Sequence, residues 1–160
     1  MKKLTLLCIL LSSIYFTNEA TAQSNQAIGL RLGPYLGVTY QAPLSNEAVL
    51  ELIFATRYRG IAFTALYEVH KDSFDVEGLQ WYYGGGGHIG FYQYYAGHPY
   101  WHDNDPGSTA ILGVDGILGI EYFIPNAPVQ LSLDWKPNFN FVGYSGFEGD
   151  NGALSVRFTF

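Results

Sequence analysis

The stretch GALSVRFTF, residues 152–160, decides the fold class of this 160-residue chain. Its large apolar side chains, Leu154, Val156, Phe158 and Phe160, occupy alternate positions, and small or polar residues occupy most positions between them. Successive side chains of a β-strand point to opposite faces, so this alternation predicts a strand with one apolar and one polar face.

The same alternation recurs along the rest of the chain. It is visible near residues 28–32, 36–41, 50–57, 61–70, 79–92, 110–124 and 129–141. Gly33-Pro34 separates the first two segments, and proline is excluded from a central strand because it lacks the ladder N–H. The chain then has eight strands, or seven if the first segment runs through Gly33-Pro34. Eight is favoured because single-chain bacterial barrels have an even number of strands.

The connections between these segments differ in length. We expect short turns near residues 42–47, 71–78 and 125–128, and longer loops near 96–108 and 143–151. Short turns at one rim and longer loops at the other are typical of outer-membrane barrels.

The composition fits neither a soluble domain nor a helical membrane protein. Charged residues are 14% of the chain and aromatic residues 17%, whereas ordinary soluble domains have roughly 25% charged residues. The prediction is an all-β protein, a closed antiparallel up-and-down transmembrane β-barrel of about eight strands. A soluble lipocalin-like ligand-binding barrel is the alternative. Its outer face would need more charged residues than the polar positions of the predicted strands, here called the polar parity, provide.

Residues 1–22 have the features of a secretory signal peptide. A basic start precedes the apolar run of residues 4–11, and Ala20-Thr21-Ala22 provides a small-x-small cleavage pattern. The apolar run is shorter than the about 20 residues of a membrane-spanning helix. We therefore expect export, cleavage before Gln23, and a barrel domain over residues 23–160.

Two function classes are disfavoured by composition. The only cysteine, Cys8, lies inside the predicted signal, so the barrel domain has no disulfide and no cysteine-metal site. The formal net charge of −6 argues against a nucleic-acid partner, because phosphates are bound by Lys and Arg.

Several stretches resemble known outer-membrane proteins. The C-terminal strand resembles the last strand of outer-membrane barrels, which implies that Val156, Phe158 and Phe160 form a signal read by the barrel assembly machinery. Residues 29–33, 79–84, 113–122 and 131–137 resemble the small, mostly uncharacterised outer-membrane β-barrel family of Bacteroidota. This resemblance implies a barrel in the cell outer membrane, in contact with its lipid, and implies no known ligand or reaction.

Charged residues of both signs occupy positions of the polar parity, and their side chains should point into the barrel. They are Arg31, Glu51, Arg57, Glu68, Asp115, Glu121, Asp134, Lys136 and Arg157. An eight-stranded barrel is only wide enough for its own side chains, and an unpaired buried charge is very costly. We therefore expect a plug of ion pairs in the lumen; a pore or a catalytic carboxylate pair is the alternative.

Lipid A-modifying enzymes also use eight-stranded barrels, so an enzyme must be considered. The deacylase type places a His and a Ser two residues apart, and none of the four histidines has a Ser at that spacing. Ser132, Ser155 and His88 share the lumen parity, but no motif links them. We expect no catalytic residues and no cofactor.

One predicted loop contains a group of metal-ligating residue types, His98, His102, Asp103 and Asp105. Their spacing matches no standard ligand pattern, so we expect no metal site there. The run Gly84–Gly87 more simply marks a bend or makes room for bulky lumen neighbours.

The sequence thus predicts a small outer-membrane barrel with a plugged lumen and a structural or surface-interaction role. Its surface ligand is not identified by any motif. A lipid-active outer-membrane enzyme is the competing class.

Overall fold

The computed structural model describes residues 26–57, 59–72, 75–93, 108–143 and 145–160. The predicted signal peptide, residues 1–22, lies outside the described residues, as does the loop that contains His98, His102, Asp103 and Asp105. Among the described residues there is no helix that is long and apolar enough to cross a membrane.

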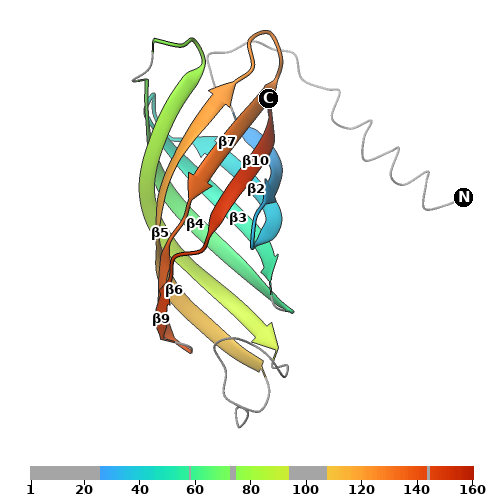
Figure 1. Ribbon diagram of the computed structural model, residues 1–160, viewed down its shortest axis with the longest axis vertical. Coiled ribbons are helices and arrows are strands. Elements are labelled where there is room, and N and C mark those ends of the chain that lie inside the picture. The colour runs from blue at the N-terminus through green and yellow to red at the C-terminus, as the bar shows by residue number, and fades with distance from the viewer. Residues whose placement is uncertain (1–25, 58, 73–74, 94–107, 144) are drawn as a thin grey trace, which may run out of the picture.

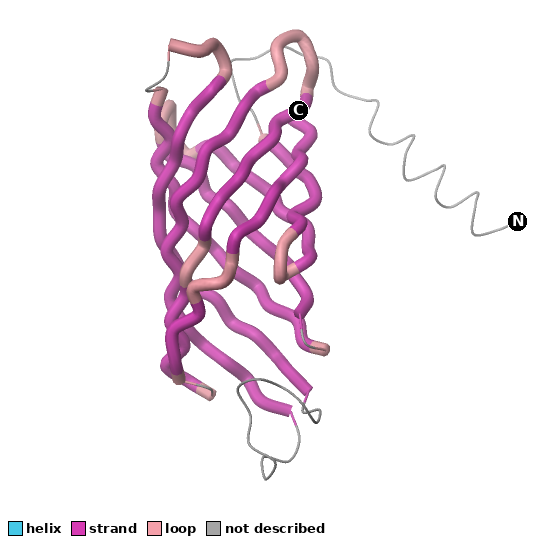
Figure 2. Tube along the Cα trace, in the orientation of Figure 1, coloured by secondary structure: helices cyan, strands magenta, loops and turns pink. Residues whose placement is uncertain are grey.

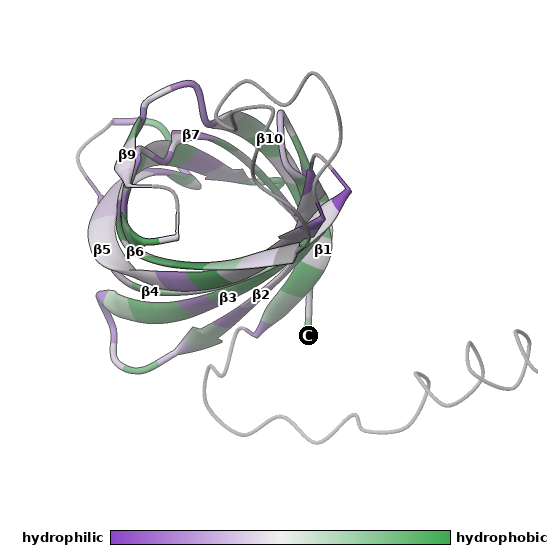
Figure 3. Cartoon of the chain, turned by 90° about the horizontal axis from the view of Figure 1, so that it is seen from below, coloured by the Kyte–Doolittle hydropathy of each residue, from purple (hydrophilic) through white to green (hydrophobic). Residues whose placement is uncertain are grey.

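Within the described ranges, ten strands form one sheet. They are β1 (Ala27–Leu32), β2 (Leu36–Pro43), β3 (Ala48–Arg57), β4 (Gly60–Lys71), β5 (Leu79–Gln93), β6 (Ser108–Phe123), β7 (Val129–Trp135), β8 (Asn138–Val142), β9 (Gly146–Glu148) and β10 (Gly152–Thr159). Neighbouring strands are antiparallel, and the pairings β1–β10 and β5–β6 complete a closed ring (Figures 1 and 3).

The ten strands make an eight-stranded barrel because two of the eight positions are interrupted. Strands β7 and β8 both pair with β6, one beyond the other, and are separated at Lys136-Pro137. Strands β9 and β10 follow them on the next position and are separated at residues 149–151. Pro137 has no N–H for the ladder, although its carbonyl still accepts from Gly116 N–H at 2.9 Å. The predicted all-β fold, a closed antiparallel barrel of eight strand positions, is confirmed.

The two ends of the barrel differ. We call the end that holds both described termini the terminal end; Phe160 N–H there donates to Gln26 O at 2.9 Å. It also holds the turn segments 44–47, 75–78 and 124–128, and we call the opposite end the loop end. The strands cross at a slant between the two ends, and β5 and β6 reach farthest toward the loop end (Figure 2).

Two details of the connections resolve what the sequence left open. Gly33-Pro34 lies in a turn between β1 and β2, which gives eight strand positions rather than seven. The long loop predicted over 143–151 is wrong, because residues 146–148 form β9, which pairs with β8 from Asn138↔Glu148 to Asn140↔Gly146. A three-residue strand with one apolar residue gives too little alternation to be found by period.

The barrel is apolar outside and polar inside. Large apolar side chains are exposed on every long strand; examples are Leu30, Val38, Phe54, Phe63, Phe91, Val114, Leu133, Phe139 and Val156. Among the described residues, a small cluster of buried apolar side chains is formed by Ile53, Ala55, Leu66, Tyr82 and Ile117. The outer face is therefore unlike that of a soluble β-barrel.

Glycines allow the wall to close around large lumen side chains. A Cβ on Gly119 would lie 2.5 Å from the Tyr82 ring, and one on Gly113 would lie 2.5 Å from the His88 ring. Gly84 and Gly86 instead face the backbone of β4, which approaches too closely for any side chain. The glycine run of β5 therefore permits close strand contact, while the glycines of β6 make room for inward rings.

Candidate functional site in the charged lumen

The lumen contains most of the charged residues that share the polar parity. Buried there are Arg31, Glu51, Glu68, Asp115, Glu121, Asp134, Lys136 and Arg157. The ninth predicted residue, Arg57, lies at the loop end of β3, at the mouth of the barrel, with its side chain 10% exposed. Each buried charge points inward because alternate side chains of its strand face the lumen. Closure of the sheet brings the polar faces of the separate strands toward one another.

Two arginine–carboxylate pairs occupy the middle of the lumen. Arg157 on β10 donates to Glu51 on β3 at 2.5 Å and to Ser132 on β7 at 2.7 Å. Arg31 on β1 binds both carboxylate oxygens of Asp134 on β7, one of them at 2.6 Å, and so spans over β10. A two-pronged guanidinium–carboxylate contact is strong and geometrically specific.

A lysine-centred cluster lies closer to the loop end. The Lys136 ammonium donates to Asp115 on β6 at 2.5 Å. The other oxygen of Asp115 lies 2.7 Å from Nδ1 of His88, and Nε2 of the same ring lies 2.7 Å from Asn140 Oδ1. Asp115 is thus held by one cation and one ring.

A third cluster lies at the terminal end. The ring of His70 on β4 lies between Glu121 on β6 and Glu68 on its own strand. Gln130 on β7 donates to Glu121 and, at 2.9 Å, to Gln41 on β2. These side chains extend a hydrogen-bonded layer across the lumen.

The mouth at the loop end is bridged by residues outside the long strands. Tyr35, in the turn before β2, donates to Glu148 on β9 at 3.0 Å. The Arg57 guanidinium lies 4.9 Å from the centre of the Tyr35 ring and pairs with Asp150 at 2.8 Å. The hydrogen bond from Arg57 lowers the pKa of Asp150 below its ordinary value. These contacts tie the β9 segment to the β1–β2 turn.

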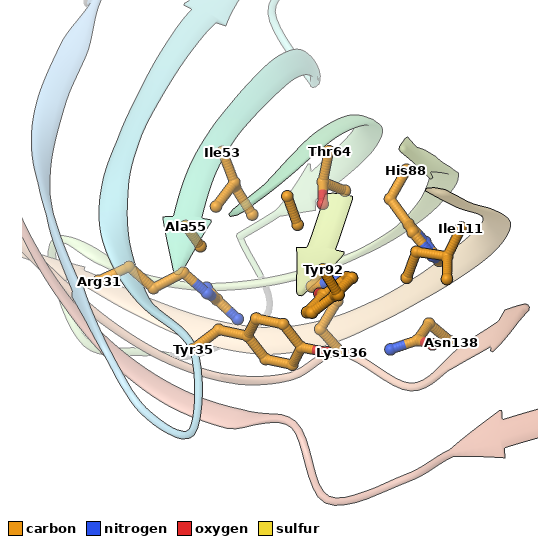
Figure 4. Close-up of a pocket in the computed structure, with 11 residues that line it drawn as sticks. Arg31, Tyr35, Ile53, Ala55, Thr64, His88, Tyr92, Ile111, Lys136 and Asn138 are labelled. Atoms are coloured by element: carbon orange, nitrogen blue, oxygen red, sulfur yellow. The ribbon is translucent and has the colours of Figure 1, made fainter. Parts of the chain in front are cut away.

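The space between these clusters is small. A cavity of about 20 Å³ lies near the loop end, bordered by Arg31, Tyr35, Ile53, His88, Tyr92 and Lys136 (Figure 4). A second cavity of about 10 Å³ lies beside Tyr35 and Asn151. Each has room for about one water molecule. The side chains in Figure 4 converge from several strands on this shared space.

Catalytic and metal-binding arrangements are not brought together in the part of the chain that the structure describes. Ser132 accepts from Arg157, whereas His88 is engaged by Asp115 and Asn140. No group of three His, Cys, Asp or Glu side chains suited to a metal ion occurs among the described residues.

Sequence reasoning missed several members of these clusters. His70 and Tyr82 share the inward parity of their strands, so that parity was the signal that could have added them, as it did His88. Glu148 was hidden because its segment was predicted to be a loop. The outward residues Val156, Phe158 and Phe160 are exposed on the outer face at the C-terminus.

Comparison with known proteins supports the fold. No protein-family model and no curated protein matches the chain. A solved structure, the N-terminal β-barrel domain of Pseudomonas aeruginosa OprF, is similar with a TM-score of 0.67 and 14% sequence identity. The match covers 86% of this chain and 98% of that domain. The chain therefore has the barrel fold of that domain, and the Bacteroidota resemblance stays a prediction.

Removal of a lumen cation should destabilise the barrel more than trimming its outer face. Arg157→Ala leaves the Glu51 carboxylate buried without its cation, and we expect a loss of about 3–5 kcal/mol in the free energy of unfolding. Leu133→Ala should cost less, because Leu133 is on the outer face, 56% exposed, where lipid can fill part of the space. Urea unfolding of the refolded barrel in lipid vesicles measures both variants.

Arg157→Ala unfolding like the parent, together with steady ion conductance in planar bilayers, would contradict the plug. The lumen would then be a hydrated channel.

Proposed function

We propose that this chain is an outer-membrane β-barrel whose lumen is closed by ion pairs, with a structural or surface-interaction role and no enzymatic activity. The observation that carries the proposal is the inverted distribution of side chains. Apolar side chains cover the outer face, and the charged ones are paired inside.

The physical reason is the solvent that such a surface requires. Large apolar side chains spread over every long strand would be costly in water, since burial of apolar surface contributes about 25 cal/mol per Å². In a bilayer the same surface is compatible with the lipid tails, and a closed sheet satisfies its backbone groups internally. Outer-membrane lipid is therefore the partner that the outer face fits best.

The lumen supports a closed barrel rather than a channel. Three full ion pairs, Arg31–Asp134, Arg157–Glu51 and Lys136–Asp115, lie within it, and the first two join strands that are not neighbours. Charges paired with this geometry do not need water, and breaking one pair strands its partner. By the usual orientation of such barrels, the terminal end would face the periplasm and the loop end the exterior.

The class of protein can be tested by fractionation. Expressed with its first 22 residues in a Gram-negative host, the protein should be recovered from the outer membrane. Its unheated form should migrate differently on a detergent gel from the boiled form, because the closed barrel resists the detergent. Recovery as a stable periplasmic monomer without detergent would instead support a soluble ligand-binding barrel.

We further propose that the barrel assembly machinery reads Val156, Phe158 and Phe160. These side chains lie on the outer face of β10, accessible before the strand is surrounded by lipid. Phe160→Ala keeps the backbone bond to Gln26 and should lower the amount of inserted protein in cells. The matched control is Thr159→Ala on the same strand, and equal insertion of the two variants would contradict the signal.

A further inference from the structure

Two carboxylates of the lumen differ from the rest in their partners. Glu51, Asp115 and Asp134 each have an Arg or Lys as ion-pair partner. The ion pairs of Glu68 and Glu121 are both made with a single ring, that of His70. All of these side chains are buried. The net charge of Glu68, His70 and Glu121 together therefore depends on how many protons the three side chains hold.

The geometry around His70 sets the number of donors that it must supply. Its Nδ1 lies 2.6 Å from Glu121 Oε1, and its Nε2 lies 3.2 Å from Glu68 Oε2. A neutral imidazole has one N–H donor and one nitrogen lone pair, whereas a carboxylate can only accept. A neutral ring would therefore leave a lone pair against a carboxylate. Two hydrogen bonds require a proton on both nitrogens, or one on a carboxyl group.

The ring has little freedom to turn away from these carboxylates. It stacks on Tyr82 of β5, with the ring centres 4.9 Å apart and the planes 10° from parallel. Glu121 is also held from the far side, since its Oε2 accepts from Gln130. The ring is therefore held by contacts with side chains of β5 and β6.

Among the described residues near this ring, each cation already has a carboxylate partner. Glu51 on β3 lies diagonally opposite Glu68 in the sheet register, and it is already paired with Arg157 of β10. Asp134 of β7 is paired with Arg31 of β1 and accepts from Tyr82 of β5. Gln130 of β7 and Gln41 of β2 are neutral. Without its extra proton, the group would place two buried carboxylates around a neutral ring, which is costly.

We propose that Glu68, His70 and Glu121 form a proton-binding site that locks β4 to β6 across β5 at the terminal end of the lumen. The bound proton completes the second hydrogen bond of the ring. His70 is the penultimate residue of β4, close to the water outside the barrel. As the pH rises, hydroxide removes this proton as water, one hydrogen bond is lost, and the terminal end of the lumen loosens.

The direction of the pH effect follows from the proton count. The lock is complete at neutral pH and is lost toward alkaline pH, so resistance to unfolding should fall as the pH rises. The site rests on lumen geometry and would stand even if the barrel were found outside a membrane.

The test uses the full barrel domain refolded in detergent micelles, with histidine labelled by ¹⁵N in the ring. The spectrum is followed from about pH 6 to about pH 10, a range that brackets the ordinary histidine titration. His70→Gln assigns the signal. We expect the His70 ring to carry both protons at neutral pH and to lose one only in the alkaline part of the range.

Glu121→Gln removes one of the two carboxylates and should move the loss of the ring proton to lower pH by about one unit or more. Glu68→Gln tests the other side and keeps the proposal testable if one variant fails to fold. The matched control is Glu47→Gln, because exposed Glu47 pairs with Lys71, next to His70 in sequence. It should leave the His70 signal unchanged.

The urea concentration at the unfolding midpoint of the parent should decrease as the pH is raised from about 8 to about 10. The midpoint of His70→Gln should change less over this range. A His70 ring that is singly protonated at neutral pH would overturn the proposal, whichever carboxyl group then holds a proton. A titration unmoved by both Glu→Gln changes would overturn it as well.

Discussion

Closure of the sheet is the constraint on which the rest of this structure depends. β1 pairs with β10 from Ala27↔Thr159 to Leu32↔Leu154, and β5 pairs with β6 over fifteen successive residue pairs. Once the ring is closed, its interior is just wide enough for its own side chains, and its outer face is exposed to the surrounding solvent or lipid. Which parity faces inward then decides where every charge is buried.

The narrow lumen in turn dictates ion pairing. Arg31 and Asp134 lie on strands that do not adjoin each other, so their contact joins β1 to β7 across the intervening β10. The same applies to Arg157 with Glu51, and to His70 with Glu121. Glycines of β6 provide the space that Tyr82 and His88 need to reach these clusters. The charged side chains of the lumen therefore connect strands that are not neighbours, in addition to filling the interior.

Much of this architecture could be predicted from the alternation of residue types. The period of two located the eight strand positions and put eight of the nine predicted charges on the inner face, because side-chain direction along a strand is local. Arg57 keeps the same parity but lies at the end of β3, so its side chain contacts residues at the mouth of the barrel. The break between β7 and β8 at Lys136-Pro137 did not disturb the alternation of inward and outward residues, so the two strands were predicted as one segment.

The partners of the charges could not be predicted in the same way. Which carboxylate meets Arg31 depends on strand register and on the slant of the barrel, which combine residues more than a hundred positions apart. The role of His70 depends on two glutamates on two strands, and no short motif joins them. Strand β9 was missed because it is stabilised by pairing with β8 rather than by its own sequence.

The central claim is that the apolar parity faces lipid, and spin labels on single cysteines test it most directly. Labels at Leu154→Cys and Val156→Cys, both exposed on the outer face, are compared in lipid vesicles with one at Asn46→Cys, exposed in a turn. The account predicts that the first two labels are accessible to oxygen and shielded from a water-soluble paramagnetic reagent, with the reverse at Asn46. Free access of the water-soluble reagent to positions 154 and 156 would contradict it.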